Sequence, residues 1–176
     1  EMENTHINIK IADLSAFAES GARSLHPDGF SRGRAAADGA GDALRSLRRF
    51  CSGDGGFDRW IRDNWHLVYR AGRYCAGELR AAGRLPSVRG TAVVCTAADE
   101  LLRSGGGEVT AKRIYAFLDG FQRSRPLSGA ELRAFVPCLM RSCIMVLADE
   151  ALGPKSDDAA GRLVGSLRFL TDTDLS

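Results

Sequence analysis

Apolar residues recur at three- and four-residue steps along most of the chain, a period typical of helices that bury one face. The sequence has no long run of alternating apolar and polar residues of the kind that would predict strands. Breaks rich in glycine and proline divide the pattern into seven segments: residues 14–25, 34–51, 57–82, 88–103 and 111–123, one that follows Ser128 and ends before Gly153, and a last one from Ser156. The sequence therefore predicts an all-α fold of about seven helices, arranged as a bundle or an orthogonal array.

The segment 57–82 predicts one long helix with a single inward stripe, and that stripe contains Trp60 and Asn64. Trp60 is accordingly interpreted as a core residue. A buried amide needs hydrogen-bond partners, because leaving it unpaired costs about 1–3 kcal/mol. We therefore expect Asn64 to be bonded within the fold, and both residues to help specify it.

Several residues indicate where helices begin and end. Ser128 and Glu131 have the Ser-x-x-Glu spacing of a capping box, in which each side chain bonds the backbone amide of the other residue. Thr110 is a candidate N-cap for the helix that follows it. Pro86 biases the preceding Leu85 toward an extended conformation. These residues should fix the helix boundaries rather than carry chemistry.

The segment after Ser128 is apolar over more than half of its circumference, so it should form the central helix of the fold. It contains Pro137, which lacks a backbone donor and whose ring clashes with the preceding turn. The sequence therefore predicts a kink or a break in the central helix at Pro137.

The chain of 176 residues is long enough for one domain with its own core. We expect a single helical domain over residues 1–176, with flexible ends at 1–10 and 171–176, and we expect it to be part of a larger protein. Its apolar runs fall short of the roughly 20 residues of a spanning helix, and the polar N-terminus lacks the apolar centre of a secretion signal. An odd number of cysteines, mostly within apolar stripes, fits buried free thiols in a reducing compartment. These features favour a cytoplasmic location.

Charge is unevenly distributed, because residues 32–89 hold twelve arginines against six acidic residues while the whole chain has a net charge of +2. Such a basic region can dock an acidic partner or a phospholipid surface, or can simply be a set of solvated helix faces. The candidate interaction residues within it are Trp65, Arg45, Arg48, Arg49 and Arg62. Trp65 either packs against a neighbouring helix or is exposed for stacking on a sugar or a partner. The low overall charge argues against a dedicated nucleic-acid binder.

Groups that would indicate catalysis or a bound ion are not clustered in the sequence. The histidines stand apart, the cysteines lack the usual zinc spacing, and the glycine-rich stretch 104–107 lacks the Gly-Lys-Ser/Thr ending of a phosphate loop. We therefore assign no catalytic residue, no metal ligand and no cofactor, and leave any small-molecule ligand open.

Four stretches resemble the N-terminal helical region of cyclic β-1,2-glucan synthases. The tract Asp-Arg-Trp-Ile-Arg-Asp-Asn-Trp-His-Leu-Val at 58–68 is similar to the Trp-Leu-Leu-Asp-Asn-Phe-His helix of that family. The Leu-Pro step at 85–86, the Arg-Pro-Leu-Ser-Gly-Ala-Glu-Leu tract at 125–132, and the interval from Pro137 to Arg141 follow in the same order. The resemblance covers about half of the chain or more.

The resemblance implies a very large, membrane-associated enzyme that uses UDP-glucose, with its glycosyltransferase modules outside this region. The chain would then be a non-catalytic accessory or scaffold module that docks those catalytic domains through an apolar groove beside the kinked sixth helix, aided by the basic region 32–89. Two alternatives remain: a stand-alone helical adaptor or regulator that binds another protein, and a carbohydrate-binding helical domain.

Overall fold

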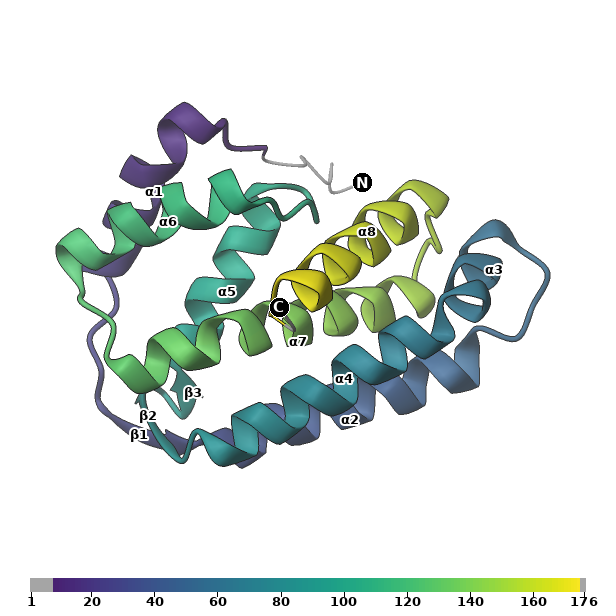
Figure 1. Cartoon of the computed structure of the whole chain (residues 1–176), viewed down its shortest axis with the longest axis horizontal. Coiled ribbons are helices and arrows are strands. Elements are labelled where there is room, and N and C mark those ends of the chain that lie inside the picture. The colour runs from purple at the N-terminus through teal and green to yellow at the C-terminus, as the bar shows by residue number, and fades with distance from the viewer. Residues whose placement is uncertain (1–7, 175–176) are drawn as a thin grey trace.

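The structure, a computed structural model, describes residues 8–174 (Figure 1). Its elements are α1 (Ile11–Arg23), β1 (Gly29–Arg32), α2 (Gly33–Phe50), α3 (Gly56–Asp63), α4 (Trp65–Ala81), β2 (Arg84–Val88), β3 (Thr91–Ala92), α5 (Val93–Ser104), α6 (Ala111–Ser124), α7 (Gly129–Ala151) and α8 (Asp157–Asp174). The predicted all-α class is confirmed, because helices make up most of the described chain and the strands are short.

Helix α7 is the centre of the fold, as predicted. It packs against α2, α4, α5 and α8, and Figure 1 shows α2 and α4 along one side of it and α8 along the other. Most of its residues are buried, including Leu139, Cys143 and Leu147, which are fully enclosed. Helices α1 and α6 pack chiefly on each other and lie at the end of the molecule reached through α5. The core is therefore built around one helix that is apolar on nearly every side.

Pro137 does not break this helix, since α7 continues as one element from Gly129 to Ala151. A proline in a helix interior removes one hydrogen bond and crowds the preceding turn. Here its ring is buried and is followed by the fully enclosed Cys138 and Leu139. Burial of apolar side chains on both flanks outweighs the lost hydrogen bond, so packing keeps the helix continuous.

The predicted helix starts at Ser128 and Thr110 are confirmed. The Ser128 hydroxyl accepts from the Glu131 amide at 3.2 Å, and the Glu131 carboxylate accepts from the Ser128 amide at 2.9 Å. Arg125 adds an ion pair to the same carboxylate at 3.1 Å, although Glu131 is only 2% exposed. Thr110 caps α6 by accepting from the Arg113 amide at 3.2 Å. Both caps satisfy amides that the first helical turn leaves without partners.

A small antiparallel sheet of order β1-β2-β3 corrects the expectation that the chain has no strands. Pro86 lies in β2 opposite Phe30, and Leu85 is extended as predicted. The residues between β2 and β3, Arg89 and Gly90, have positive φ angles of 51° and 80°, as a two-residue hairpin turn requires. Strands of two to five residues are too short to show an alternation, so the sequence pattern could not reveal them.

The two ends of the chain are only partly described, because residues 1–7 and 175–176 lie outside the described range. Of the ends expected to be flexible, the structure describes residues 8–10 and 171–174. Ile9 donates to the Ser104 carbonyl at 2.8 Å and accepts from Arg113 at 2.7 Å, and α8 extends past the buried Thr171. In the part that the structure describes, no helix is both long and apolar enough to cross a bilayer.

Candidate functional site

The helix expected over 57–82 is interrupted at Asn64, which separates α3 from α4. The backbone of Asn64 leaves the helical region (φ −112°, ψ 16°), and its side chain takes two partners. Its amide nitrogen donates to the Trp60 carbonyl at 2.9 Å, and its amide oxygen accepts from Arg168 of α8 at 2.9 Å. The prediction that this amide is bonded is confirmed, whereas the prediction of one continuous helix is wrong.

The stripe predicted for this segment faces the core on both sides of Asn64, with Trp60 as the exception. In α3 the inward positions belong to Phe57 and Ile61, each 1% exposed, and Trp60 is left 42% exposed. The prediction that Trp60 is a core residue is therefore wrong, because Trp60 lies at the edge of the buried stripe, where its ring borders Gly161 of α8 and stays partly in solvent. Trp65, the first residue of α4, is half-buried and packs against the core, with its ring centroid 6.1 Å from that of Tyr69.

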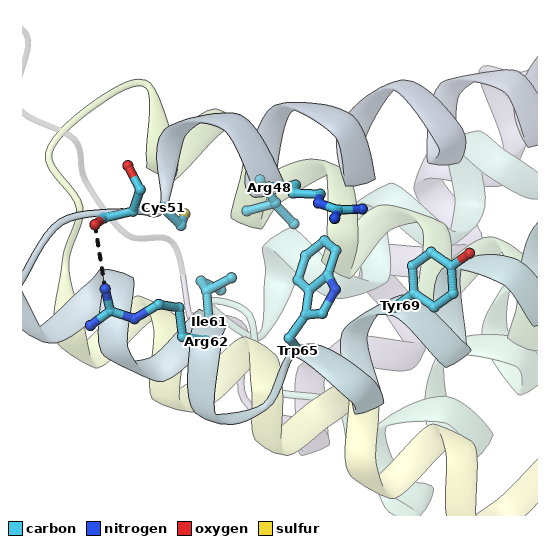
Figure 2. A pocket seen from close by; sticks show the side chains of 8 residues that line it. Arg48, Cys51, Ile61, Arg62, Trp65 and Tyr69 are labelled. Atoms are coloured by element: carbon cyan, nitrogen blue, oxygen red, sulfur yellow. Dashed lines mark hydrogen bonds between the residues drawn. The ribbon is translucent and has the colours of Figure 1, made fainter.

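A cavity of about 630 Å³ opens beside this joint, between the C-terminal part of α2 and the start of α4 (Figure 2). Its walls combine aliphatic, aromatic and basic side chains: Leu47, Arg48, Cys51, Ser52, Ile61, Arg62, Trp65 and Tyr69. Figure 2 shows the Trp65 ring standing between the two helices, with Arg48 and Tyr69 on its flanks. The volume suits a side chain or a small ligand rather than solvent alone.

The candidate interaction residues divide into two groups. Trp65, Arg48 and Arg62 meet at the cavity, although they come from three different helices. Arg45 instead forms an ion pair with Asp42, and Arg49 lies over the ring of Phe50 at 5.3 Å. The latter two are therefore outside the cavity wall.

Tyr69, Cys51 and Ser52 also line the cavity, although the sequence did not single them out. Tyr69 follows Trp65 by one helical turn and so shares its face, which is a pattern that could have found it. Cys51 and Ser52 come from the loop after α2, and only the tertiary fold brings that loop to the cavity.

The loop beneath the cavity is anchored by an ion pair between the buried Asp58 and the partly exposed Lys155. Asp58 is 3% exposed and lies 3.0 Å from the Lys155 ammonium, which also donates to the Phe50 carbonyl at 2.9 Å. The Asp58 carboxylate also accepts from the Gly53 amide at 2.8 Å, and Arg62 donates to the Gly53 carbonyl at 2.7 Å. Burial alone would raise the pKa of Asp58, but the hydrogen bonds from Lys155 and Gly53 outweigh it and leave the pKa below its ordinary value of 3.8.

Cys51 lines the cavity, but its environment does not activate it. Burial, together with the nearby Asp58 charge, raises the pKa of the Cys51 thiol above its ordinary value of 9.0. A thiol held neutral is a poor nucleophile, because the thiolate is the reactive form. We therefore interpret Cys51 as an apolar side chain in the cavity wall rather than as a nucleophile.

The basic region 32–89 forms a second cavity at the other end of α2, of about 700 Å³, lined by Arg32, Arg34, Arg80 and Arg84 with one acid, Asp38. Arg80 pairs with Asp38 at 3.7 Å, and Arg84 lies over the Phe30 ring at 5.0 Å. Its walls lack the aromatic side chains found around Trp65. The basic residues are thus divided between two ends of the molecule rather than forming one face.

The predicted sixth helix is α7 in the structure. The groove that we expected beside it corresponds to small hollows. One between α4 and α7 has a volume of about 140 Å³, and one beside Met140 of about 30 Å³. Both are much smaller than the cavity at the α3–α4 joint. A docking site of useful size is therefore placed at Trp65 rather than along α7.

The side chains that line the Trp65 cavity include apolar, aromatic and basic groups. Within residues 8–174 no group of three or more histidine, cysteine or acidic side chains is placed to hold a metal ion. The described residues that line the cavity include neither a carboxylate nor a histidine.

Comparison with protein-family models, with curated proteins and with solved structures found no match. Any assignment of function therefore rests on the geometry of the site.

Proposed function

We propose that this chain is a non-catalytic helical docking module, and that its Trp65 cavity binds an acidic, partly apolar segment of a partner protein. The observation that carries the proposal is the meeting of Trp65 and Tyr69 with Arg48 and Arg62 around one open cavity. Tryptophan, tyrosine and arginine are the residue types enriched at the energetic centres of protein interfaces.

The charges around the cavity favour an acidic occupant. Arg48 is exposed and has no carboxylate partner within residues 8–174. Arg62 is exposed and already donates to the loop carbonyl of Gly53, so part of its hydrogen-bonding capacity holds the wall. A guanidinium can grip a carboxylate through two parallel hydrogen bonds, and the neighbouring aromatic rings exclude water from such a pair. An Asp or Glu followed by a bulky apolar residue fits both parts of the cavity.

A sugar is the second occupant to consider, because Trp65 and Tyr69 offer ring surface for stacking. Ligand sites of this kind also need a few polar groups that fix the orientation of the ligand. The polar lining groups described here are two arginines, Ser52 and the Tyr69 hydroxyl, which lack carboxylate or amide acceptors for sugar hydroxyls. The cavity chemistry therefore favours an acidic peptide over a carbohydrate.

The resemblance to cyclic β-1,2-glucan synthases supplies the first partner to test. Under that resemblance the module would act as a scaffold for a UDP-glucose-dependent glycosyltransferase. In our proposal, the transferase would present the acidic segment, and this chain would contribute no catalytic residue. A stand-alone adaptor would use the same cavity for another protein.

Tryptophan fluorescence tests the proposal directly, since the chain has two tryptophans and Trp60 is outside the cavity. In the Trp60→Phe variant, Trp65 is the sole reporter. The probes are a short synthetic peptide with Glu-Leu-Phe repeats, the same peptide with Gln in place of Glu, a glucose disaccharide and UDP-glucose. We expect saturable quenching or a blue shift of the Trp65 emission with the acidic peptide, and an affinity for the Gln peptide weaker by about tenfold or more.

The outcomes separate the candidate occupants. Arg48→Glu should abolish the response to the acidic peptide, whereas Arg73→Glu, on an exposed position of α4 outside the cavity wall, should leave it unchanged. A saturable response to the disaccharide or to UDP-glucose, but not to the peptide, would replace our proposal with the carbohydrate-binding alternative. Equal responses to the Glu and Gln peptides would contradict the role of the arginines.

A further inference from the structure

We propose that Cys95 and Cys138 form an oxidisable dithiol that a small hydroperoxide converts into a disulfide bond between α5 and α7. Their sulfur atoms lie 3.0 Å apart in the interior of the protein, and both residues are buried. A disulfide needs the two sulfurs to approach to about 2.05 Å, so the bond requires only a small movement. This modification site is separate from the Trp65 cavity and does not rest on its proposed role.

The two thiols are inequivalent, which provides an attacking and a resolving sulfur. The hydrogen bond from Cys138 lowers the pKa of Cys95, and the nearby charge of Arg141 acts in the same direction. The same hydrogen bond and burial raise the pKa of Cys138. Of the two sulfurs, Cys95 is therefore the one that ionises more readily, and Cys138 is the one that holds its proton more tightly. Low-pKa thiols are the ones that hydroperoxides oxidise.

The remaining buried thiols provide an internal contrast. Burial raises the pKa of Cys75 to about 12, and burial raises that of Cys143 to about 12 as well. Cys51 also has a pKa above its ordinary value, chiefly because of burial. Reactivity should therefore be confined to one pair among the five cysteines.

Cys95 borders a small hollow, separate from those described above. A cavity of about 120 Å³ is lined by Cys95 and Arg141, together with residues from β1, the start of α2 and β3. This volume accommodates hydrogen peroxide or a few waters, whereas a bulky disulfide reagent would not fit. Arg141 is held in place there by donating to the Ala36 carbonyl at 3.0 Å. The oxidant is therefore a small hydroperoxide.

The chemistry balances in two steps. The Cys95 thiolate attacks one oxygen of hydrogen peroxide, the O–O bond breaks, and the departing hydroxide takes up a proton to leave as water. Cys95 is then a sulfenic acid. The Cys138 sulfur displaces the oxygen from Cys95, an S–S bond forms, and the second water leaves with the Cys138 proton. Overall, two thiols are oxidised and one peroxide is reduced to two waters.

The test is to expose the full chain to hydrogen peroxide under native conditions, then unfold it and alkylate the remaining free thiols. We expect intact mass to fall by two hydrogen atoms before alkylation, and peptide mapping to join Cys95 to Cys138. Cys75 and Cys143 should stay alkylatable, with oxidation at least about tenfold slower than at the pair. Dithiothreitol should restore all five free thiols.

Single variants make the assignment falsifiable. Cys138→Ser should stop the reaction at a Cys95 sulfenic acid that a 1,3-dicarbonyl probe captures, whereas Cys143→Ser should still form the cross-link. Far-UV circular dichroism checks that each variant is folded. Loss of Cys75 and Cys143 at the same rate as the pair would indicate oxidation of an unfolded form and would overturn the proposal. Unchanged thiols after exposure, or first oxidation at Cys51, would also overturn it.

Discussion

The joint between α3 and α4 is held by polar contacts, whereas the middle of α7 is held by apolar packing. At the joint, Asn64 bonds Trp60 and Arg168, and Asp58 pairs with Lys155. Around Pro137, the neighbouring side chains are almost entirely buried in the core. Polar contacts at a half-exposed joint can hold an open cavity without filling it, while packing in the core leaves little free volume. The Trp65 cavity therefore lies beside the break between α3 and α4. The continuous helix α7 provides the rigid core that supports it.

The largest expected effect comes from removing packing beside Pro137. Phe135 is 2% exposed, and its ring lies 6.4 Å from that of Phe117 in a stacked arrangement. Phe135→Ala should lower the free energy of unfolding by about 3–5 kcal/mol, because it leaves a cavity in the core. Urea unfolding followed by circular dichroism measures this change. The exposed Leu132 on the same helix is the control, and Leu132→Ala should change stability by less than about 1 kcal/mol.

The next effect concerns the polar joint itself. Asn64→Ala removes the bonds to the Trp60 carbonyl and to Arg168, and should destabilise the protein by about 1–3 kcal/mol. The Trp65 emission should shift as well, because Asn64 positions the start of α4. The neighbouring exposed Asp63 provides a matched control, so Asp63→Ala should leave both readouts nearly unchanged. A stable Asn64→Ala variant with unaltered emission would mean that packing alone holds the joint.

The Asp58–Lys155 pair predicts a smaller, pH-dependent effect. Lys155→Met should cost about 1 kcal/mol at neutral pH, because Lys155 is more than a third exposed and solvent screens the pair. Since the folded-state pKa of Asp58 is lower than its ordinary value of 3.8, its contribution is present above that value and is lost as the pH falls through the folded pKa. The stability difference between wild type and Lys155→Met should therefore shrink in strong acid. A difference that grows below pH 3.8 would contradict this assignment.

Pro137→Ala should have the smallest effect, below about 1 kcal/mol in either direction. Alanine restores a backbone donor and relieves crowding in the preceding turn. It also removes buried ring carbons from a packed core, which costs stability. The two terms oppose each other, and equilibrium unfolding measures the balance. A gain of several kcal/mol would show that α7 is strained at Pro137, and a loss of that size would show that the ring itself holds the packing.

Local chemistry explains which parts of the fold were predictable. The capping box of Ser128 and Glu131, the Thr110 cap and the extended Leu85 each depend on residues within a few positions of one another. The central position of α7 follows from its apolar circumference. In these cases sequence neighbours supply the decisive interactions, so the pattern predicts the structure.

Long-range contacts explain what the pattern missed. The break at Asn64 involves Arg168, far along the chain. The half-exposed position of Trp60 likewise depends on a distant neighbour, Gly161 of α8. Of the predicted kink or break at Pro137, the break does not occur, since α7 continues as one element packed by four other helices. The same holds for the candidate site, since Trp65, Arg48 and Arg62 were singled out individually but only the tertiary fold places them around one cavity.

A charge swap at Arg48 tests the central claim, that the cavity recognises an acidic segment, most directly. In the Trp60→Phe background, the Trp65 emission of Arg48→Glu would be titrated with the Glu-Leu-Phe peptide and with its Lys-Leu-Phe counterpart. Our account predicts that the variant binds the lysine peptide more tightly than the glutamate peptide, the reverse of the parent preference. An unchanged preference for the glutamate peptide in Arg48→Glu would contradict the proposed function.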